Sequence, residues 1–282
     1  MALDQISDDQ LEELAGGEAE MSFLDHLEEL RWHLIRALMA IAVFMVTAFV
    51  MKDFFFGQII LGPSRTDFLT YKFLCDIGRL FSSEAFCMEK LPFIIQSRQM
   101  TGQFTMHITS SFVIGLVCAF PYVFWEVWRF IKPGLYPKEQ RSARGATFWV
   151  SFLFLIGVSF GYFLLAPISV NFLGNYQIDP SILNEFDIIS YVSTVTILVL
   201  ASGILFQLPI VVFFLTKAGL IYPKLMKHYR KHAIVVILVL GAMITPPDPI
   251  SQILIAVPLV GLYQVSISIS NFVYKRNQKL LK

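Results

Sequence analysis

Two glutamates that border long apolar stretches are well suited to bind cations. Glu29 lies in the segment 22–31, which reads SFLDHLEELR, and Glu126 lies between Trp125 and Trp128. A carboxylate binds a guanidinium group through forked, charge-assisted hydrogen bonds. Two carboxylates from different segments could therefore each bind one guanidinium group.

Each glutamate also has a purely structural interpretation. Glu29 has helical spacing to His33 and Arg36, so it could pair along its own helix. Glu126 could be an interfacial charge that pairs with Arg129, three residues further along. From the residue pattern alone, both interpretations remain open.

The sequence gives little indication of a metal site or of a catalytic site. His26 and Glu29 are three residues apart and His228 and His232 four apart, which is ligand spacing on a helix, but the second pair is surrounded by lysine and arginine. These cations would repel a metal ion. No nucleophile motif or phosphate-binding loop is present. We therefore predict that the protein is not an enzyme and holds no cofactor.

The composition is that of a membrane protein. Of the 282 residues, 56% are apolar and 15% are charged, whereas soluble domains have about 25% charged residues. The formal net charge of +1 gives no sign of nucleic-acid binding.

Six apolar stretches are candidate membrane spans, since about 20 apolar residues cross a bilayer. They cover residues 37–51 with an extension towards Leu34, 99–125, 145–178, 188–216, 233–247 and 249–274. The fifth stretch has fifteen residues between His232 and Asp248, about 22 Å of helix, so it is a short span. Prolines at 121, 209 and 258 predict bends, although proline is also common in membrane helices.

The positive charges predict the orientation. Sixteen Lys and Arg residues fall on the side of the two termini and the loops 126–144 and 217–232, against six in the long loop 52–98 on the other side. Positive loops face the cytoplasm, so both termini are predicted to be cytoplasmic. The predicted fold class is an all-α polytopic membrane protein, a bent and concave bundle of six helices of which the fifth and sixth are short.

Three parts are expected along the chain. Residues 1–20 hold seven acidic residues and no Lys or Arg, as in a disordered tail. Residues 21–275 form the membrane domain, including the outer loop 52–98, and residues 276–282 form a basic cytoplasmic tail.

Several motifs together resemble the TatC family, the multispanning subunit of the twin-arginine protein translocase. They are the segment 22–31, the segment 121–139 around Glu126, Phe206-Gln-Leu-Pro209 and Thr245-Pro-Pro-Asp248, in this order over roughly residues 21–275. The resemblance implies a protein of the cytoplasmic (inner) membrane that binds twin-arginine signal peptides on folded cargo. It also implies oligomers within a complex with small single-span subunits of the TatA/TatB type, and transport driven by the proton-motive force.

The resemblance also implies roles for particular residues. Glu29 and Glu126 match the glutamates implicated in reading the arginine pair, and Arg31 matches another important residue. Gln207 stands where the family often has glutamate, and we expect it to contact a partner's transmembrane helix; hydrogen bonding within the chain, to Ser193, Ser202 or another helix, is the alternative. Structural roles are expected for the turn and kink residues Pro63, Pro133, Gly134, Pro209, Pro246, Pro247 and Asp248.

The three cysteines fall in different surroundings. Cys75 and Cys87 lie in the outer loop on the predicted oxidising side, and Cys118 lies within the second span. A disulfide between Cys75 and Cys87 is therefore predicted.

The main alternative function is that of an ion-coupled secondary solute transporter. Such a protein needs ionisable groups at mid-membrane and paired broken helices from internal repeats. The sequence shows an amide at 207 and no convincing repeat of spans.

Overall fold

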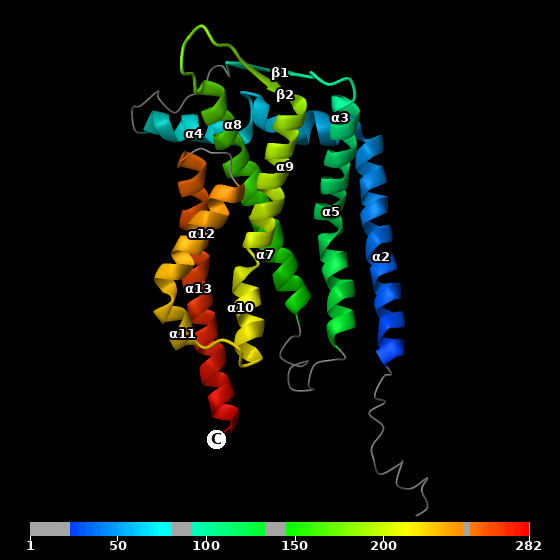
Figure 1. The fold of residues 1–282 in the computed structure, drawn as a ribbon, viewed down its shortest axis with the longest axis vertical. Coiled ribbons are helices and arrows are strands. Elements are labelled where there is room, and N and C mark those ends of the chain that lie inside the picture. Colours follow the sequence, from blue (N-terminus) through cyan, green and yellow to red (C-terminus); the bar gives the residue numbers. More distant parts are fainter. Residues whose placement is uncertain (1–22, 81–91, 133–144, 245–248, 282) are drawn as a thin grey trace, which may run out of the picture.

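A computed structural model describes residues 23–80, 92–132, 145–244 and 249–281, and these form a helical bundle (Figure 1). The elements in chain order are α2 (Phe23–Val50), α3 (Lys52–Phe54), α4 (Leu69–Leu80), β1 (Phe93–Gln96), α5 (Gly102–Ile131), α7 (Ala146–Phe160), α8 (Ala166–Asn175), β2 (Asn184–Asp187), α9 (Ile188–Leu205), α10 (Leu208–Lys217), α11 (Pro223–His228), α12 (Arg230–Ile244) and α13 (Pro249–Leu281). Two π-helical segments, Phe55–Ile60 and Gly161–Leu165, and a 3₁₀ turn, Gly62–Ser64, complete the set.

Within the described residues, five helical stretches are long and apolar enough to cross a membrane. They are Glu28–Val50, Gly102–Ile131, Ala146–Asn175, Ile188–Lys217 and Ser251–Arg276, which agree with five of the predicted spans. The remaining predicted span corresponds to α12, a helix of 15 residues. As expected, that helix is short. It is not among the helices long enough to cross a membrane, so the sixth crossing stays a prediction.

The prediction of a short sixth helix is wrong. Helix α13 has 33 residues and continues to Leu281, so residues 276–281 extend this helix instead of forming a separate tail. The physical reason is local: residues 275–281 contain neither glycine nor proline and are mostly Lys, Arg, Gln and Leu, which favour helix.

The three prolines predicted to bend the spans occupy different positions in their helices. Pro121 lies inside α5 and Pro258 inside α13, and both helices continue through them. The fourth span, in contrast, divides into α9 and α10 at residues 206 and 207, directly before Pro209. Pro209 lies in the first turn of α10, where its missing N–H is tolerated.

Small residues bring the helices close together. A Cβ atom on Gly157 would lie 2.6 Å from the backbone oxygen of Ser202, and one on Gly161 would lie 2.9 Å from that of Leu198. These contacts join α7 and the following π segment to α9. Since lipid supplies no hydrophobic drive between helices, close packing of small residues is the usual means of association.

Hydroxyl groups add hydrogen bonds between spans. The Ser169 and Ser251 hydroxyls lie 2.5 Å apart and join α8 to α13, and Thr216 donates to Ser270 at 2.9 Å between α10 and α13. All four side chains are buried in the bundle.

At one end of the bundle, α4 lies across the ends of the spans (Figure 1). Its Tyr71 is buried and its hydroxyl lies 2.8 Å from the carbonyl of Pro63 and 2.9 Å from that of Pro167. Burial raises the pKa of the Tyr71 phenol, so the group stays protonated and able to donate. Pro63 is itself buried in the 3₁₀ turn, and Tyr71 thus connects this turn to α8.

Replacing Tyr71 with Phe is expected to reduce the free energy of unfolding by about 1–3 kcal/mol, because the single hydroxyl donor that two buried carbonyl oxygens share is lost. Thermal unfolding of the purified chain in detergent measures this loss. Tyr176→Phe is the matched control, because Tyr176 is an exposed tyrosine at the end of α8. Equal unfolding temperatures for the two variants would contradict the role of Tyr71.

A short parallel strand pair was not predicted from the sequence. Residues 93–96 of β1 pair with residues 184–187 of β2, in the register Phe93 opposite Asn184. Four-residue strands leave too little alternation to be recognised in a sequence. The pair connects the segment before α5 to the segment before α9 at the same end as α4 (Figure 1).

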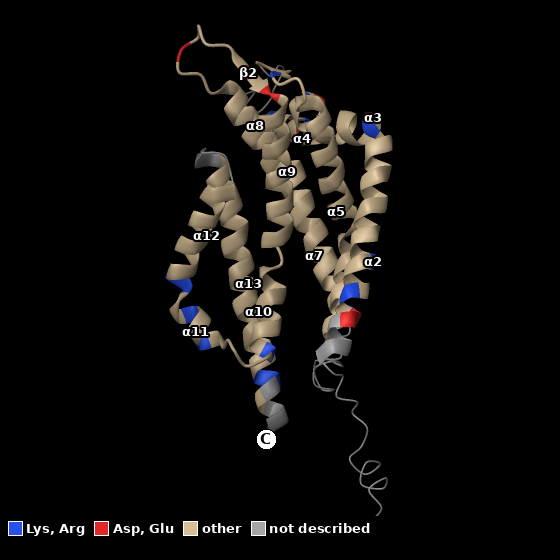
Figure 2. Cartoon of the chain, turned by 45° about the vertical axis from the view of Figure 1, so that its right-hand side comes forward, with Lys and Arg blue, Asp and Glu red and all other residues tan. Residues whose placement is uncertain are grey.

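Among the described residues, Lys, Arg, Asp and Glu lie mainly towards the two ends of the bundle (Figure 2). We call one end of the bundle the basic end. It is formed by the start of α2, the ends of α5 and α10, α11, the start of α12 and the last turns of α13. Its described cations are Arg31, Arg36, Arg129, Lys132, Lys217, Lys224, Lys227, Arg230, Lys231, Lys275 and Arg276. The opposite end carries α3, α4 and the strand pair, with charges of both signs.

Candidate functional site

A buried carboxylate lies at the basic end, on the last turns of α5. The Glu126 side chain is 1% exposed and has three hydrogen-bonding partners. Its Oε2 lies 2.5 Å from Nδ1 of His33 and 3.5 Å from Nη1 of Arg36, and its Oε1 accepts a hydrogen bond of 2.9 Å from the Tyr122 hydroxyl. The charge of Glu126 is therefore compensated within the protein.

The packing of α2 against α5 produces this arrangement. These two helices share the most extensive contact between elements in the described structure. His33 and Arg36 are three residues apart and face α5 from one side of α2, while Tyr122 and Glu126 are four apart on α5. Gly115 permits the approach, because a Cβ atom there would lie 2.8 Å from the backbone nitrogen of Met45.

The structural interpretation of Glu126 as an interfacial charge paired with Arg129 is wrong. Arg129 instead lies over the indole ring of Trp125, 5.3 Å from its centre, and Glu126 points towards α2. Likewise, His33 and Arg36 pair with Glu126 and not with Glu29. The cause is tertiary: the partners are 93 and 90 residues apart in the chain.

Glu29 and Arg31 lie on α2, before His33. Glu29 is half-buried and Arg31 is exposed. Glu29 is one helical turn from His33, so the two share a face of α2. No ion pair or hydrogen bond joins Glu29 or Arg31 to a residue that the structure describes.

His33 and Tyr122 were not singled out from the sequence as site residues. The signal for Tyr122 was its spacing of four residues from Glu126, and the signal for His33 was its spacing of four residues from Glu29. Neither spacing indicates a partner on another helix.

Gln207 lies at the break between α9 and α10 and is partly satisfied within the chain. Its Nε2 donates to the Val150 carbonyl at 3.2 Å and lies 3.5 Å from that of Gly203. Its buried Oε1 has no hydrogen-bonding partner among the described residues. The amide nitrogen of Gln207 thus donates to α7, while its oxygen accepts no hydrogen bond from a described residue. The predicted contact with a partner helix stays a prediction.

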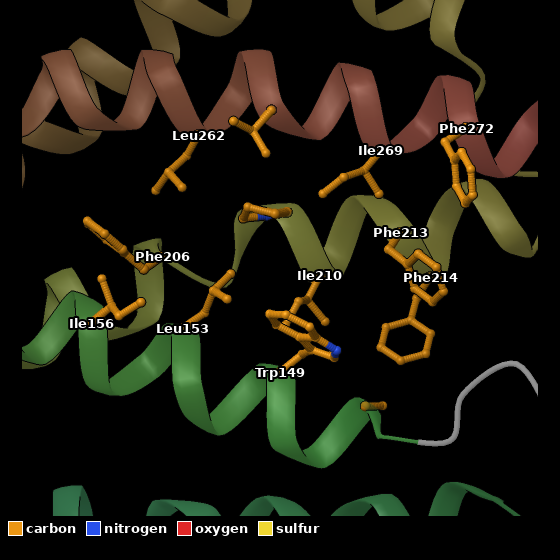
Figure 3. Close-up of a pocket in the computed structure, with 13 residues that line it drawn as sticks. Trp149, Leu153, Ile156, Phe206, Ile210, Phe213, Phe214, Leu262, Ile269 and Phe272 are labelled. Carbon is orange, nitrogen blue, oxygen red and sulfur yellow. The ribbon is translucent and has the colours of Figure 1, made fainter.

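An apolar pocket of about 750 Å³ lies beside this break, between α7, α10 and α13 (Figure 3). Figure 3 shows Trp149 and Leu153 of α7 opposite Leu262 and Ile269 of α13, with Ile210 between them. The lining side chains are apolar, so the pocket offers contact area without a fixed charge.

Several predicted residues lie outside the described part of the chain: Pro133, Gly134, Pro246, Pro247, Asp248 and Cys87. Cys75 lies on α4 and is disulfide-bonded, while Cys118 on α5 is free and exposed. The pairing of Cys75 with Cys87 therefore stays a prediction.

The histidine pair considered for metal binding is divided between two helices. His228 ends α11 and His232 lies in α12, and each ring packs near that of Tyr229. In the described ranges, no group of three or more His, Cys, Asp or Glu side chains is placed to hold a metal ion.

Comparisons with known proteins agree on one family. The model of the family "Sec-independent protein translocase protein (TatC)" matches residues 25–258. The TatC protein of Blattabacterium sp. subsp. Periplaneta americana is 40% identical over 259 residues, 91% of this chain and 97% of the relative. The TatCy protein of Bacillus subtilis is 31% identical over 260 residues, 92% of each chain.

The fold is similar to two crystal structures described as the Twin Arginine Translocase Receptor TatC. The first has a TM-score of 0.64 and 29% identity and covers 88% of this chain and 99% of its own. The second, in DDM, has a TM-score of 0.67 and 31% identity and covers 87% and 99%. With a matching family model, relatives of nearly equal length and this bundle of spans, the chain belongs to the TatC family, a non-enzymatic family of multi-pass membrane proteins that act in twin-arginine protein transport.

Proposed function

We propose that this protein is the receptor subunit that binds twin-arginine signal peptides and exports folded proteins across the cytoplasmic membrane. The observation that carries this proposal is the Glu126 carboxylate, buried at the basic end and held by side chains of a second helix. A buried carboxylate is uncommon unless it is paired. Here it lies on the same helix pair as the half-buried Glu29.

The two glutamates fit an arginine pair for electrostatic reasons. Most charged residues that the structure describes at the basic end are Lys or Arg, so a positively charged peptide is attracted there only by specific carboxylates. Each guanidinium that forms a charge-assisted hydrogen bond with Glu29 or Glu126 contributes about 1.5–3 kcal/mol. Arg31, exposed on the same helix, would help to orient the peptide.

We propose that the basic end faces the cytoplasm, with both termini there. The described cations concentrate at this end, and the positive-inside rule places such ends in the cytoplasm. In this orientation α4 and the strand pair lie at the outer surface, where an oxidising compartment supports a Cys75–Cys87 disulfide.

We propose that the energy for transport and the other subunits of the translocase come from outside this chain. The sequence carries no phosphate-binding loop, so the proton-motive force is the proposed source. Small single-span subunits of the TatA/TatB type and further copies of this chain are the proposed partners. The apolar pocket and the unused acceptor of Gln207 are compatible with contacts to partner helices.

A pair of synthetic signal peptides tests the proposed function. One carries Arg-Arg and the other Lys-Lys at the same position, and binding to the chain in lipid nanodiscs is measured for both. We expect the Arg-Arg peptide to bind more tightly, because an ammonium group cannot form the forked contact, and we expect Glu29→Ala and Glu126→Ala to abolish the difference. Equal affinities in the unchanged protein would refute the proposal.

The rival function, ion-coupled solute transport, requires ionisable groups near the middle of the membrane. Among the described residues of the five spans, the carboxylates are Glu28, Glu29 and Glu126, all near helix ends at the basic end. A solute carrier would not discriminate between the two peptides, so the same experiment separates the functions.

Replacing Gln207 with Leu is expected to weaken co-purification with the small subunits, because an amide acceptor within the membrane is lost. The change also removes the hydrogen bond to Val150, so thermal unfolding of each variant is measured alongside. Thr109→Val is the control, a polar group on α5 whose hydroxyl bonds only within its own helix. Unchanged co-purification of the Leu variant would argue against a partner contact.

A further inference from the structure

The apolar pocket between α7, α10 and α13 is open at the surface of the bundle. Of the side chains that line it, Trp149 is 57% exposed and Phe272 is 69% exposed. Both residues lie within stretches that are long and apolar enough to cross a membrane. The pocket therefore opens towards the hydrocarbon of the bilayer. Its volume of about 750 Å³ lies in the range of known ligand sites.

The break in the fourth span explains why the pocket exists. Before the break, α9 packs against α7, whereas after the break α10 packs mainly against α13. Phe206 at the break and Pro209 in the first turn of α10 both line the pocket. Because the packing partner changes at this point, α10 lies away from α7 and the space between them remains open.

The pocket extends along about half the thickness of a membrane. On α13 its lining runs from Leu262 to Phe272, a rise of about 15 Å at 1.5 Å per residue. The hydrocarbon core of a bilayer is roughly 30 Å thick. Leu262 is near the middle of the span Ser251–Arg276, and Ala146 at the other end of the pocket is the first residue of its own span. This length suits an acyl chain of a single leaflet.

Two cations continue the apolar faces that line the pocket. On α10, Phe213 lines the pocket and Lys217 follows it four residues later. On α13, Phe272 lines the pocket and Arg276 likewise follows four residues later. Residues four apart share a helix face, and Lys217 and Arg276 are the last residues of their spans. Both cations therefore lie at the end of the pocket that meets the membrane surface.

The chemistry of this end suits a phosphate group. Helices α7, α10 and α13 contain no Asp or Glu, so no acidic side chain of the helices that form the pocket offsets the two cations. A guanidinium group binds phosphate through forked hydrogen bonds and an ammonium group binds it as a point charge. Figure 3 shows the ring nitrogen of Trp149 directed towards Phe214, at the same end. An indole N–H at this depth can donate to the ester oxygens of a lipid.

We propose that this pocket binds an anionic phospholipid, with an acyl chain along α13 and the phosphate between Lys217 and Arg276. The pocket is apolar along its length and basic at its end, which matches an amphiphile with a negative headgroup. An apolar helix of a partner would use the wall of the pocket without using the two cations. Basic pockets between membrane helices are known to bind anionic headgroups in this way.

This inference does not rest on the proposed receptor function. It requires only that the chain spans a membrane and that the basic end lies at one surface of it. In the proposed orientation that surface is the cytoplasmic one, where anionic lipids attract basic segments.

Native mass spectrometry of the full chain, purified in detergent and titrated with phosphatidylglycerol or phosphatidylcholine, tests the proposal. We expect phosphatidylglycerol, the anionic lipid, to bind more tightly. Arg276→Gln and Lys217→Gln should each weaken its binding about fivefold, the usual effect of one cation near a lipid surface, and leave binding of phosphatidylcholine unchanged. Lys275→Gln is the matched control, because Lys275 is an exposed neighbouring cation that is turned about 100° away from Arg276 around α13.

Filling the pocket provides a test that does not change any charge. Val265 lines the pocket on α13, whereas Val257 is an exposed valine of the same helix outside the lining. We expect Val265→Trp to weaken binding of both lipids, because the larger ring occupies the space of the acyl chain, and Val257→Trp to leave binding unchanged. Thermal unfolding in detergent shows that each variant is folded before its lipid binding is compared.

Three results would overturn the lipid site. The first is equal binding of the two lipids by the unchanged protein. The second is an equal loss in Arg276→Gln and Lys275→Gln, since total charge and not the pocket would then determine affinity. The third is unchanged lipid binding in Val265→Trp together with reduced co-purification of the small subunits, which would assign the pocket to a partner helix. The proposed function is tested separately by the Arg-Arg and Lys-Lys peptides, so failure of one proposal is distinguishable from failure of the other.

Discussion

Glu126→Gln is expected to weaken binding of the Arg-Arg peptide by about 10- to 150-fold, which corresponds to the 1.5–3 kcal/mol of a hydrogen bond to a charged group. Gln has nearly the same shape but carries no charge and only one acceptor oxygen. It therefore loses the forked contact with a guanidinium. The affinity for the Lys-Lys peptide should fall less, so the preference between the peptides should narrow.

Titration of both peptides against the purified variant in nanodiscs measures this effect. Glu28→Gln is the matched control, because Glu28 is an exposed carboxylate on α2 at the same end of the bundle. It reports the loss of one negative charge without loss of the buried site. If Glu28→Gln and Glu126→Gln weakened binding equally, overall charge and not the buried carboxylate would determine affinity.

The second large effect is expected at Gly157, where replacement by Ala should reduce the free energy of unfolding by about 1–3 kcal/mol through overpacking. The added Cβ would lie 2.6 Å from the Ser202 oxygen and 2.9 Å from the Cα of Gly203. Both are backbone atoms of α9, so neither can rotate away. The helices would have to separate, and the packing of the third and fourth spans would loosen.

Gly261→Ala is the matched control for this change. Gly261 lies within α13, and nothing lies within 4 Å of a Cβ added there. The same substitution should therefore leave stability unchanged or raise it slightly, because alanine favours helix by about 1 kcal/mol over glycine. Thermal unfolding in detergent compares the two variants, and a loss of similar size in both would contradict the packing argument.

Local patterns were sufficient for much of the architecture. The uncharged stretches predicted the third, fourth and last of the five spans to within three residues, whereas the first span begins nine residues earlier than predicted and the second ends six residues later. Pro209 correctly marked the break between α9 and α10 in the fourth span. Gly219, just after the end of α10, has a positive φ of 76°, which glycine adopts without strain. The length of α13 was misjudged, because charged residues that end a membrane span do not end a helix.

The sequence by itself determined which segments are apolar enough to cross a membrane, where cations gather and which glutamates border the spans. These properties depend on the type and spacing of nearby residues, and the hydrocarbon core of the bilayer selects them directly. Only the tertiary structure decided that Glu126 is buried and shared by His33, Arg36 and Tyr122. That contact depends on how α2 and α5 approach and rotate against each other, through close packing at Gly115 and along the whole pair, and no spacing within either helix encodes it.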